Sequence, residues 1–396
     1  MALDFQQVHE QVLQLGEQAP QREQRLNELR QKAHELLERY AGDLDALRDR
    51  VAMIVRSHDP SLRCAAPVNE TLTAHLALPE LPPNLTILAA DGSQIAPDRH
   101  APVEYCLINV GAVQMRHGTT EPAVTKVTSQ LFYAEEIETP IGLITDATLA
   151  LRRDLNERRM LAELASRAEP PVVTFTDGPM ELWGGKDGTS EEATEFQKSL
   201  EDYKSVLTRL NDLQVITAGY VDKPGANLVV RLLETMQIPD EHLPEIRKHH
   251  PLRGVRDFEL FRGLLGAGER SAVFALQSQS ARSYPGPLAL HFFYINTGRS
   301  GHPWLARVEI PSWVAEDSQM LDTLQATLVQ QCRALGNRPY PYILHRAHET
   351  AVVTLQEREQ VTEMISLELR RRGVPVGEQS YKQSAKESTG RTRYER

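Results

Sequence analysis

Two aspartates in this 396-residue chain follow the same local pattern, a short apolar run and then Asp-Gly. Asp91 follows LTILAA and Asp177 follows VVTFT. We expect each run to be a central strand with its aspartate at the carboxyl end, where open α/β sheets bind ligands. Two carboxylates on neighbouring strands suit Mg²⁺ or Mn²⁺, which can polarise a phosphodiester and generate hydroxide. Asp-Gly is also a common turn dipeptide, so either motif alone is weak.

The helix predicted between these strands carries the candidates for a third ligand. Its segment RRDLNERRMLAEL places Glu157 on the same face as Arg153, four residues earlier. Glu163 is the competing acid and Asp154 a weaker one. Carboxylates on helices are usually solvated, so the spacing leaves the choice among these three acids open.

Two histidines, His345 and His348, lie at the expected start of the last helix, in YPYILHRAHETAVV. Their spacing suits a zinc pair, but neither a cysteine nor an HExxH pattern accompanies it. One histidine beside a carboxylate–metal site is better suited to orienting water, binding phosphate or acid–base catalysis. A histidine at a helix start can equally be a capping or packing residue.

The run RKHHPLRGVRDFELFRG is basic and is interleaved with Phe258 and Phe261. A basic loop with aromatic residues suits a nucleic-acid backbone and stacked bases. Arg253 and Arg256 are the candidate phosphate contacts in this run. The alternative is a solvated face whose charges are balanced by acidic neighbours.

Motifs of several other classes are absent from the sequence. GLLGAGERS and GGKDGTS lack the Gly-Lys-Ser/Thr ending of a Walker loop, and no Gly-x-Ser-x-Gly elbow occurs. The three cysteines are widely spaced and form no CxxC pair, which supports neither a zinc ribbon nor a disulfide framework. Nucleotide hydrolysis and serine-hydrolase chemistry are therefore disfavoured.

Composition bounds the class of protein. The hydrophobic fraction of 41% and charged fraction of 25% are those of an ordinary globular chain. No apolar run approaches the roughly 20 residues that span a bilayer, and the N-terminus lacks a secretory pattern, so we expect a cytoplasmic protein. The net charge of −10 argues against a broadly basic surface that coats nucleic acid. It leaves room for a local basic groove in an enzyme that a partner holds on its substrate.

The elements that must position these residues alternate between strand and helix patterns. Strands are expected at 85–90, 103–114, 172–177, 215–221, 271–277, 288–296 and 305–311, and helices at 146–168, 191–213, 226–236, 317–334 and 345–372. This order predicts an α/β fold, a mixed sheet covered by helices, in one catalytic domain over residues 85–372. Residues 58–84, rich in Pro, Ser and Asn, are expected to be a linker, and the apolar-poor tail 373–396 to be disordered.

Residues 1–57 predict a helical arm before the catalytic domain. Between Leu26 and Ile54, apolar residues recur in alternating steps of three and four, as a coiled-coil seam requires. Pro20 and Gly42 mark expected breaks, which indicates a helical hairpin or two packed helices. The arm would pair or dock with a partner, or simply pack on its own domain.

Over residues 85 to 360, these motifs together resemble the NurA nuclease family. The resemblance rests on an ordered set: AADGSQ, then RRDLNERRML with FTDGPM, then AGYVDKP, then LHRAHETAV. It implies an RNase H-like core and a deoxyribonuclease that depends on Mn²⁺, with Mg²⁺ as the alternative. The implied role is DNA end processing in repair, by 5′–3′ exonuclease and single-strand endonuclease cleavage. The implied assembly is a homodimer docked on a hexameric HerA-type helicase-translocase.

By position, the resemblance assigns the family's metal-binding aspartates to Asp91 and Asp177 and its C-terminal histidine to His348. The family's helix glutamate falls on Glu157, with Glu163 as the alternative. These assignments imply metal binding by the two aspartates and the glutamate. The histidine would contact the scissile phosphate or assist proton transfer.

The family also uses a tyrosine, for which Tyr220 in AGYVDKP is the candidate. Lys223 is the alternative polar residue in the same turn. Either one would position the nucleic-acid backbone.

Two other functions compete with a DNA nuclease. A non-catalytic adaptor would use the helical arm and a sheet edge to hold a partner ATPase, although the chain keeps all the acidic positions. An RNA-directed nuclease on the same fold cannot be separated by composition, because contacts to the 2′-hydroxyl are not visible in sequence.

Overall fold

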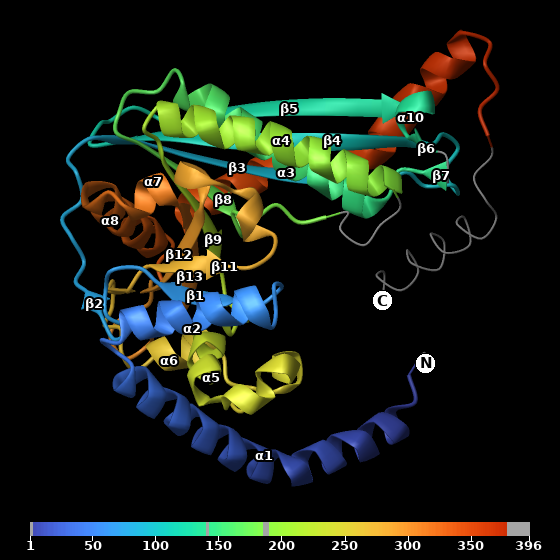
Figure 1. The fold of residues 1–396 in the computed structure, drawn as a ribbon. Helices are drawn as coiled ribbons and strands as arrows, with labels where there is room; N and C mark the ends of the chain where they lie inside the picture. The colour runs from blue at the N-terminus through green and yellow to red at the C-terminus, as the bar shows by residue number, and fades with distance from the viewer. Residues whose placement is uncertain (1–2, 140–141, 185–189, 378–396) are drawn as a thin grey trace. The chain divides into compact units, whose positions relative to one another are not determined.

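The computed structural model describes residues 3–139, 142–184 and 190–377, which form two compact units (Figure 1). The first unit comprises Met1–Pro82, Gly178–Glu181 and Ala218–Pro341, and the second comprises Pro83–Asp177, Leu182–Thr217 and Tyr342–Arg396. Each candidate carboxylate and His348 belong to the second unit. That unit is therefore the one that positions the predicted chemistry.

The sheet of the second unit begins as an antiparallel meander and continues in parallel. Its strands lie in the order β5 (Val124–Tyr133), β4 (Tyr105–His117), β3 (Leu85–Ile95), β8 (Val172–Asp177) and the start of β9 (Ile216–Val221). β3 pairs antiparallel with β4 and parallel with β8. This is a mixed sheet, as predicted. A small hairpin, β6 (Glu138–Thr139) and β7 (Gly142–Leu143), lies outside it.

Helices cover both faces of this sheet (Figure 1). One face carries α3 (Asp146–Ala165), on which α4 (Ser190–Asp212) packs, and the other carries α9 (Tyr342–Ala351) and α10 (Leu355–Arg371). Side chains alternate between the faces of a strand. Gly92 of β3 accordingly faces α3, and Ser93 faces α9. The predicted mixed sheet flanked by helices is confirmed.

The first unit contains antiparallel strands and an aromatic core. Its strands are β1 (Cys64–Pro67), β2 (His75–Leu76), the last part of β9, β10 (Arg270–Ser271), β11 (Phe274–Gln277), β12 (Leu290–Asn296) and β13 (Leu305–Pro311). Its helices are α1 (Phe5–Arg39), α2 (Leu44–Ser57), α5 (Leu228–Gln237), α6 (Asp257–Phe261), α7 (Ser312–Ala315) and α8 (Ser318–Ala334). Four aromatic rings stack or tilt against one another inside it: Phe261, Phe274, Phe292 and Tyr294.

The helical arm differs from its prediction at one of its two expected breaks. The chain breaks between α1 and α2 around Gly42, as predicted, and five seam residues are buried: Ala33, Leu36, Leu47, Val51 and Ile54. Pro20 does not break α1, which runs through it. This stretch is exposed, so water can bond the carbonyl that proline leaves without its helical partner.

Three further segments differ from their predictions. Residues 58–84, expected to be a linker, contain β1 and β2, and β1 pairs with β11 through the fully buried Cys64 and Ala65. Strand β5 was not predicted, because its exposed sequence VTKVTSQLFY lacks the apolar density of a buried strand. The single helix expected at 345–372 is two helices, since Thr354 caps the start of α10.

The disorder predicted for the tail falls, from residue 378 onward, outside the residues described here. Throughout the described part of the chain, no helix combines the length and apolar character needed to cross a membrane.

Replacing Gly111 with alanine should push α9 away from the sheet. A Cβ at this position of β4 would lie 2.6 Å from the Ala351 nitrogen and 2.7 Å from the Thr350 carbonyl carbon, both rigid backbone atoms. Overpacking of this kind lowers the free energy of unfolding by about 1–3 kcal/mol. Urea unfolding of the purified protein measures the effect. Gly263→Ala is the control, since nothing lies within 4 Å of its added Cβ, and an equal loss in both variants would contradict the packing assignment.

Candidate active site

Asp91 lies within a strand and not at a strand end, contrary to the prediction. β3 continues to Ile95, because its partner β4 stays paired over that length. The parallel pairing with β8 stops earlier, at Ala90 and Thr176. Asp91 and Asp177 therefore follow directly after the last paired residues of these two neighbouring strands. β8 ends at Asp177.

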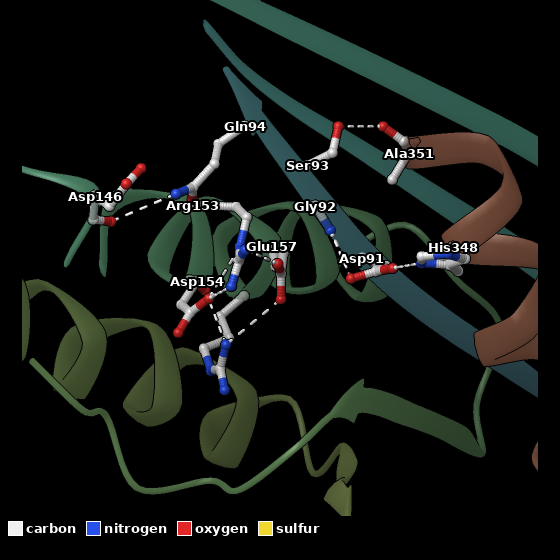
Figure 2. Close-up of polar contacts among 11 residues, drawn as sticks. Asp91, Gly92, Ser93, Gln94, Asp146, Arg153, Asp154, Glu157, His348 and Ala351 are labelled. Carbon is white, nitrogen blue, oxygen red and sulfur yellow. Dashed lines mark hydrogen bonds and ion pairs between the residues drawn. The ribbon is translucent and has the colours of Figure 1, made fainter. Parts of the chain in front are cut away.

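His348 contacts Asp91 directly (Figure 2). Its Nδ1 lies 2.7 Å from Asp91 Oδ2, and Asp91 Oδ1 accepts a 2.8 Å hydrogen bond from the Gly92 backbone N–H. The imidazole is 63% exposed, so it is held on one side and open to a substrate on the other. His345, the other candidate, pairs with Glu349 instead, at 3.4 Å.

Three residues that the sequence did not single out hold α9 in place. The Ala351 carbonyl at the helix end accepts hydrogen bonds from Ser93 Oγ at 2.6 Å and Asn109 Nδ2 at 2.8 Å. These bonds satisfy a carbonyl that a helix end leaves without a partner. Gly111 lets the helix backbone come close. Two features of the sequence could have indicated these residues: a serine directly after Asp91-Gly92, and a single Asn in the apolar strand YCLINVGAV.

Glu157 lies on the other side of β3, against Gly92 (Figure 2). Its Oε1 is 2.8 Å from the point where a Gly92 Cβ would stand, so only glycine leaves room for it. The side chain is buried, and this burial raises the pKa of Glu157 to about 8. Among its charged neighbours, Arg158 opposes this rise in pKa most strongly and Arg153 opposes it less, whereas the carboxylates of Asp154 and Asp91 contribute to it.

The competing acids on α3 have other partners. Glu163 pairs with Lys126 at 2.9 Å and with Arg167 at 3.3 Å. Asp154 accepts hydrogen bonds from Arg153, the shorter of 2.8 Å from Nη2. The structure thus brings Glu157 into the electrostatic neighbourhood of Asp91, and leaves Glu163 in an ion-pair cluster of its own.

The other predicted residues lie in the first unit. Tyr220 is completely buried in β9, and its hydroxyl donates to the Pro339 carbonyl at 3.3 Å. Direct contact of this side chain with a substrate is therefore not supported. Lys223, the alternative, is exposed, and its Nζ lies 5.0 Å from the centre of the Trp304 ring.

The basic run is partly neutralised in the structure. Arg247 pairs with Asp59 at 2.6 Å and Lys248 with Glu245 at 2.9 Å. Phe261 belongs to the aromatic core, so it is not available to stack on a base. Arg253 and Arg256 are exposed and stay candidates for phosphate contact.

Asp91 and Glu157 fit a hard divalent cation, although the full ligand set is not assembled. Among the residues described, no three His, Cys, Asp or Glu side chains are arranged to hold a metal. Mg²⁺-type ions are commonly bound by one or two carboxylates, with water and substrate phosphate completing the shell. Burial raises the pKa of Glu157 to about 8, and a divalent ion bound there would favour its ionised form.

The chain is similar to known proteins over the region that contains these residues. A model of the NurA domain matches residues 85–353, which include all four residues Asp91, Glu157, Asp177 and His348. The chain is similar to the NurA nuclease from Sulfolobus solfataricus, with 11% identity over 85% of this chain and 97% of that one, at a TM-score of 0.43. It is also similar to the catalytic domain of human Endonuclease V, with 15% identity over 82% of this chain and 99% of that one, at a TM-score of 0.31. No curated protein matches the sequence. Because the domain model covers more than half of the chain, the protein belongs to the NurA family.

Proposed function

We propose that this NurA-family nuclease is a divalent-metal-dependent deoxyribonuclease with its active site around Asp91. The observation that carries the proposal is the convergence of Asp91, Glu157 and His348 about Gly92, inside the region matched to the NurA domain. A buried carboxylate at Gly92, a second carboxylate on the preceding residue and an exposed imidazole form a set that suits hydrolysis of phosphodiesters.

The carboxylates of Asp91, Glu157 and Asp177 would hold Mn²⁺, with Mg²⁺ as the alternative. The bound ion would polarise the scissile phosphodiester and lower the pKa of the attacking water. Asp177 is exposed at the end of β8, one position beyond the last residue paired with β3. From there its carboxylate can complete a ligand set when substrate binds.

His348 would act at the substrate. Asp91 fixes its Nδ1 at 2.7 Å, which orients the ring and favours one tautomer. The exposed remainder of the ring can then donate to a phosphate oxygen or transfer a proton. The anchoring of α9 through the Ala351 carbonyl keeps this orientation, since His348 lies one turn before that carbonyl.

The finer parts of the proposed function come from the family resemblance. They are cleavage of single strands internally and of DNA ends with 5′ polarity, by a homodimer docked on a HerA-type translocase. Exposed Arg253, Arg256 and Lys223 would contact DNA phosphates. The net charge of −10 favours an enzyme whose DNA is supplied by a partner over one that binds DNA through its whole surface.

Asp91→Asn and Asp177→Asn should each reduce DNA cleavage by roughly 100-fold or more, because metal-assisted chemistry contributes several kcal/mol to the barrier. The assay uses end-labelled single- and double-stranded DNA with Mn²⁺, Mg²⁺ or chelator, with and without a HerA-type partner. Chelator should abolish wild-type cleavage. Full metal-dependent cleavage by purified Asp91→Asn would contradict the assignment, and partner binding without cleavage under any condition would favour the adaptor.

Glu157→Gln and Glu163→Gln form a matched pair on α3. Glu157→Gln should lose cleavage to a similar extent, whereas Glu163→Gln should stay within about twofold of wild type, since its carboxylate pairs only at the surface. The same cleavage assay measures both variants. The opposite ranking would transfer the third-ligand role to Glu163.

Gly92→Ala should damage the site while leaving the fold intact. The added Cβ would stand 2.5 Å from Arg153 Cγ and 2.8 Å from Glu157 Oε1, both of them side-chain atoms. Displacing these groups by about 1 Å should reduce cleavage by roughly 100-fold. Circular dichroism and the thermal midpoint should change little. An active Gly92→Ala enzyme would show that the approach of α3 to Gly92 is not needed for chemistry.

A further inference from the structure

Arg153 lies at the centre of the carboxylate cluster, and the proposed mechanism gives it no role. It lies on α3 one turn before Glu157, and its side chain packs against β3 at Gly92 (Figure 2). Its Cγ and Cδ stand 2.5 Å and 2.9 Å from the point where a Gly92 Cβ would be. The glycine therefore admits the arginine stem as well as the glutamate.

The guanidinium of Arg153 pairs with two carboxylates. Its Nη2 is 2.8 Å from Asp154 Oδ1, and its Nε is 3.4 Å from Glu157 Oε1. Burial opposes its positive charge, yet the pKa of Arg153 is raised, because Asp154, Glu157 and Asp91 all stabilise the charged form. One organic cation thus pairs with Glu157 and lies in the electrostatic surroundings of Asp91, two of the three carboxylates proposed to hold the metal.

The neighbouring Arg158 also faces Glu157 but is fixed in the protein interior. Its Nη1 donates to the Asp154 carbonyl at 3.0 Å, and its guanidinium lies 5.2 Å from the centre of the Tyr203 ring. The Arg153 side chain is 30% exposed, and the contacts given above join it to side-chain carboxylates. Of the two arginines, Arg153 is the one with a path toward solvent.

We propose that Arg153 occupies the cation position of the Asp91–Glu157 cluster in the metal-free protein and must be displaced for a divalent ion to bind. Arg153 thereby sets the affinity of the site for metal. This inference rests on the proposed function, in which these two carboxylates and that of Asp177 hold the ion. It also explains why, among the described residues, the carboxylates of the proposed site are not arranged around a common point.

The physical basis is competition between two cations for the same carboxylates. A fixed unit charge a few ångströms from the ion opposes metal binding strongly, even at the effective dielectric of a protein surface. Movement of Arg153 into solvent recovers most of that energy, so the remaining effect is smaller. Removing the charge should therefore strengthen metal binding roughly tenfold.

The test is isothermal titration calorimetry of Mn²⁺ into the full-length protein without DNA. Arg153→Gln and Arg153→Met should each bind Mn²⁺ roughly tenfold more tightly than wild type, and Arg153→Lys, which keeps the charge, should stay near wild type. Arg159→Gln is the matched control, because Arg159 lies on the same helix but pairs with Asp202 at 2.7 Å. It should leave Mn²⁺ affinity unchanged. Using two neutral variants keeps the test valid if one of them fails to fold.

Glu157→Gln and Asp91→Asn separate failure of this inference from failure of the proposed function. If wild-type Mn²⁺ binding needs both carboxylates, but neutral Arg153 variants bind Mn²⁺ equally or more weakly, Arg153 is a structural support and the inference is overturned alone. If Mn²⁺ binding does not depend on Glu157 or Asp91, the proposed metal site is wrong and the inference falls with it.

Discussion

The candidate site depends on the close approach of α3 to β3 at a single residue without a side chain. Gly92 admits the carboxylate of Glu157 and the stem of Arg153, and any other residue would put a Cβ within 3 Å of both. This contact removes Glu157 from water while leaving it near other carboxylates. Its charge then depends on what cations the site contains. The remainder of the second unit can be understood as support for that contact.

The opposite face of β3 supplies the support. Side chains of β3 and β4 hold the carbonyl end of α9, and Gly111 removes the obstacle to its approach. This packing places His348 beside Asp91. Consecutive residues of β3 lie on its two faces: Asp91 and Ser93 face α9, and Gly92 faces α3. The motif Asp-Gly-Ser is thus a packing requirement as much as a chemical one.

Much of this could be predicted from sequence, for reasons that particular elements make clear. The α3 helix and strands β3, β4 and β8 have strong periodic or continuous apolar patterns, and Asp91, Glu157 and His348 stand at recognisable points of an ordered motif set. Strand β5 was missed because its exposed face carries polar residues. The burial of Tyr220 was not predicted, because a strand that ends in a turn does not reveal which of its side chains a later segment will cover. Arg153 was noted only as a helix neighbour, since the role of a cation among carboxylates depends on distances that spacing does not give.

The central claim is that Asp91 and Glu157 share a divalent ion, and the position of that ion is the most direct test. Anomalous scattering from crystals of the protein grown with Mn²⁺ and a non-cleavable DNA would locate it. We expect an anomalous peak at about 2.1 Å from oxygens of both carboxylates, with the Arg153 guanidinium moved away. A peak elsewhere, or one that Glu157 does not contact, would contradict it.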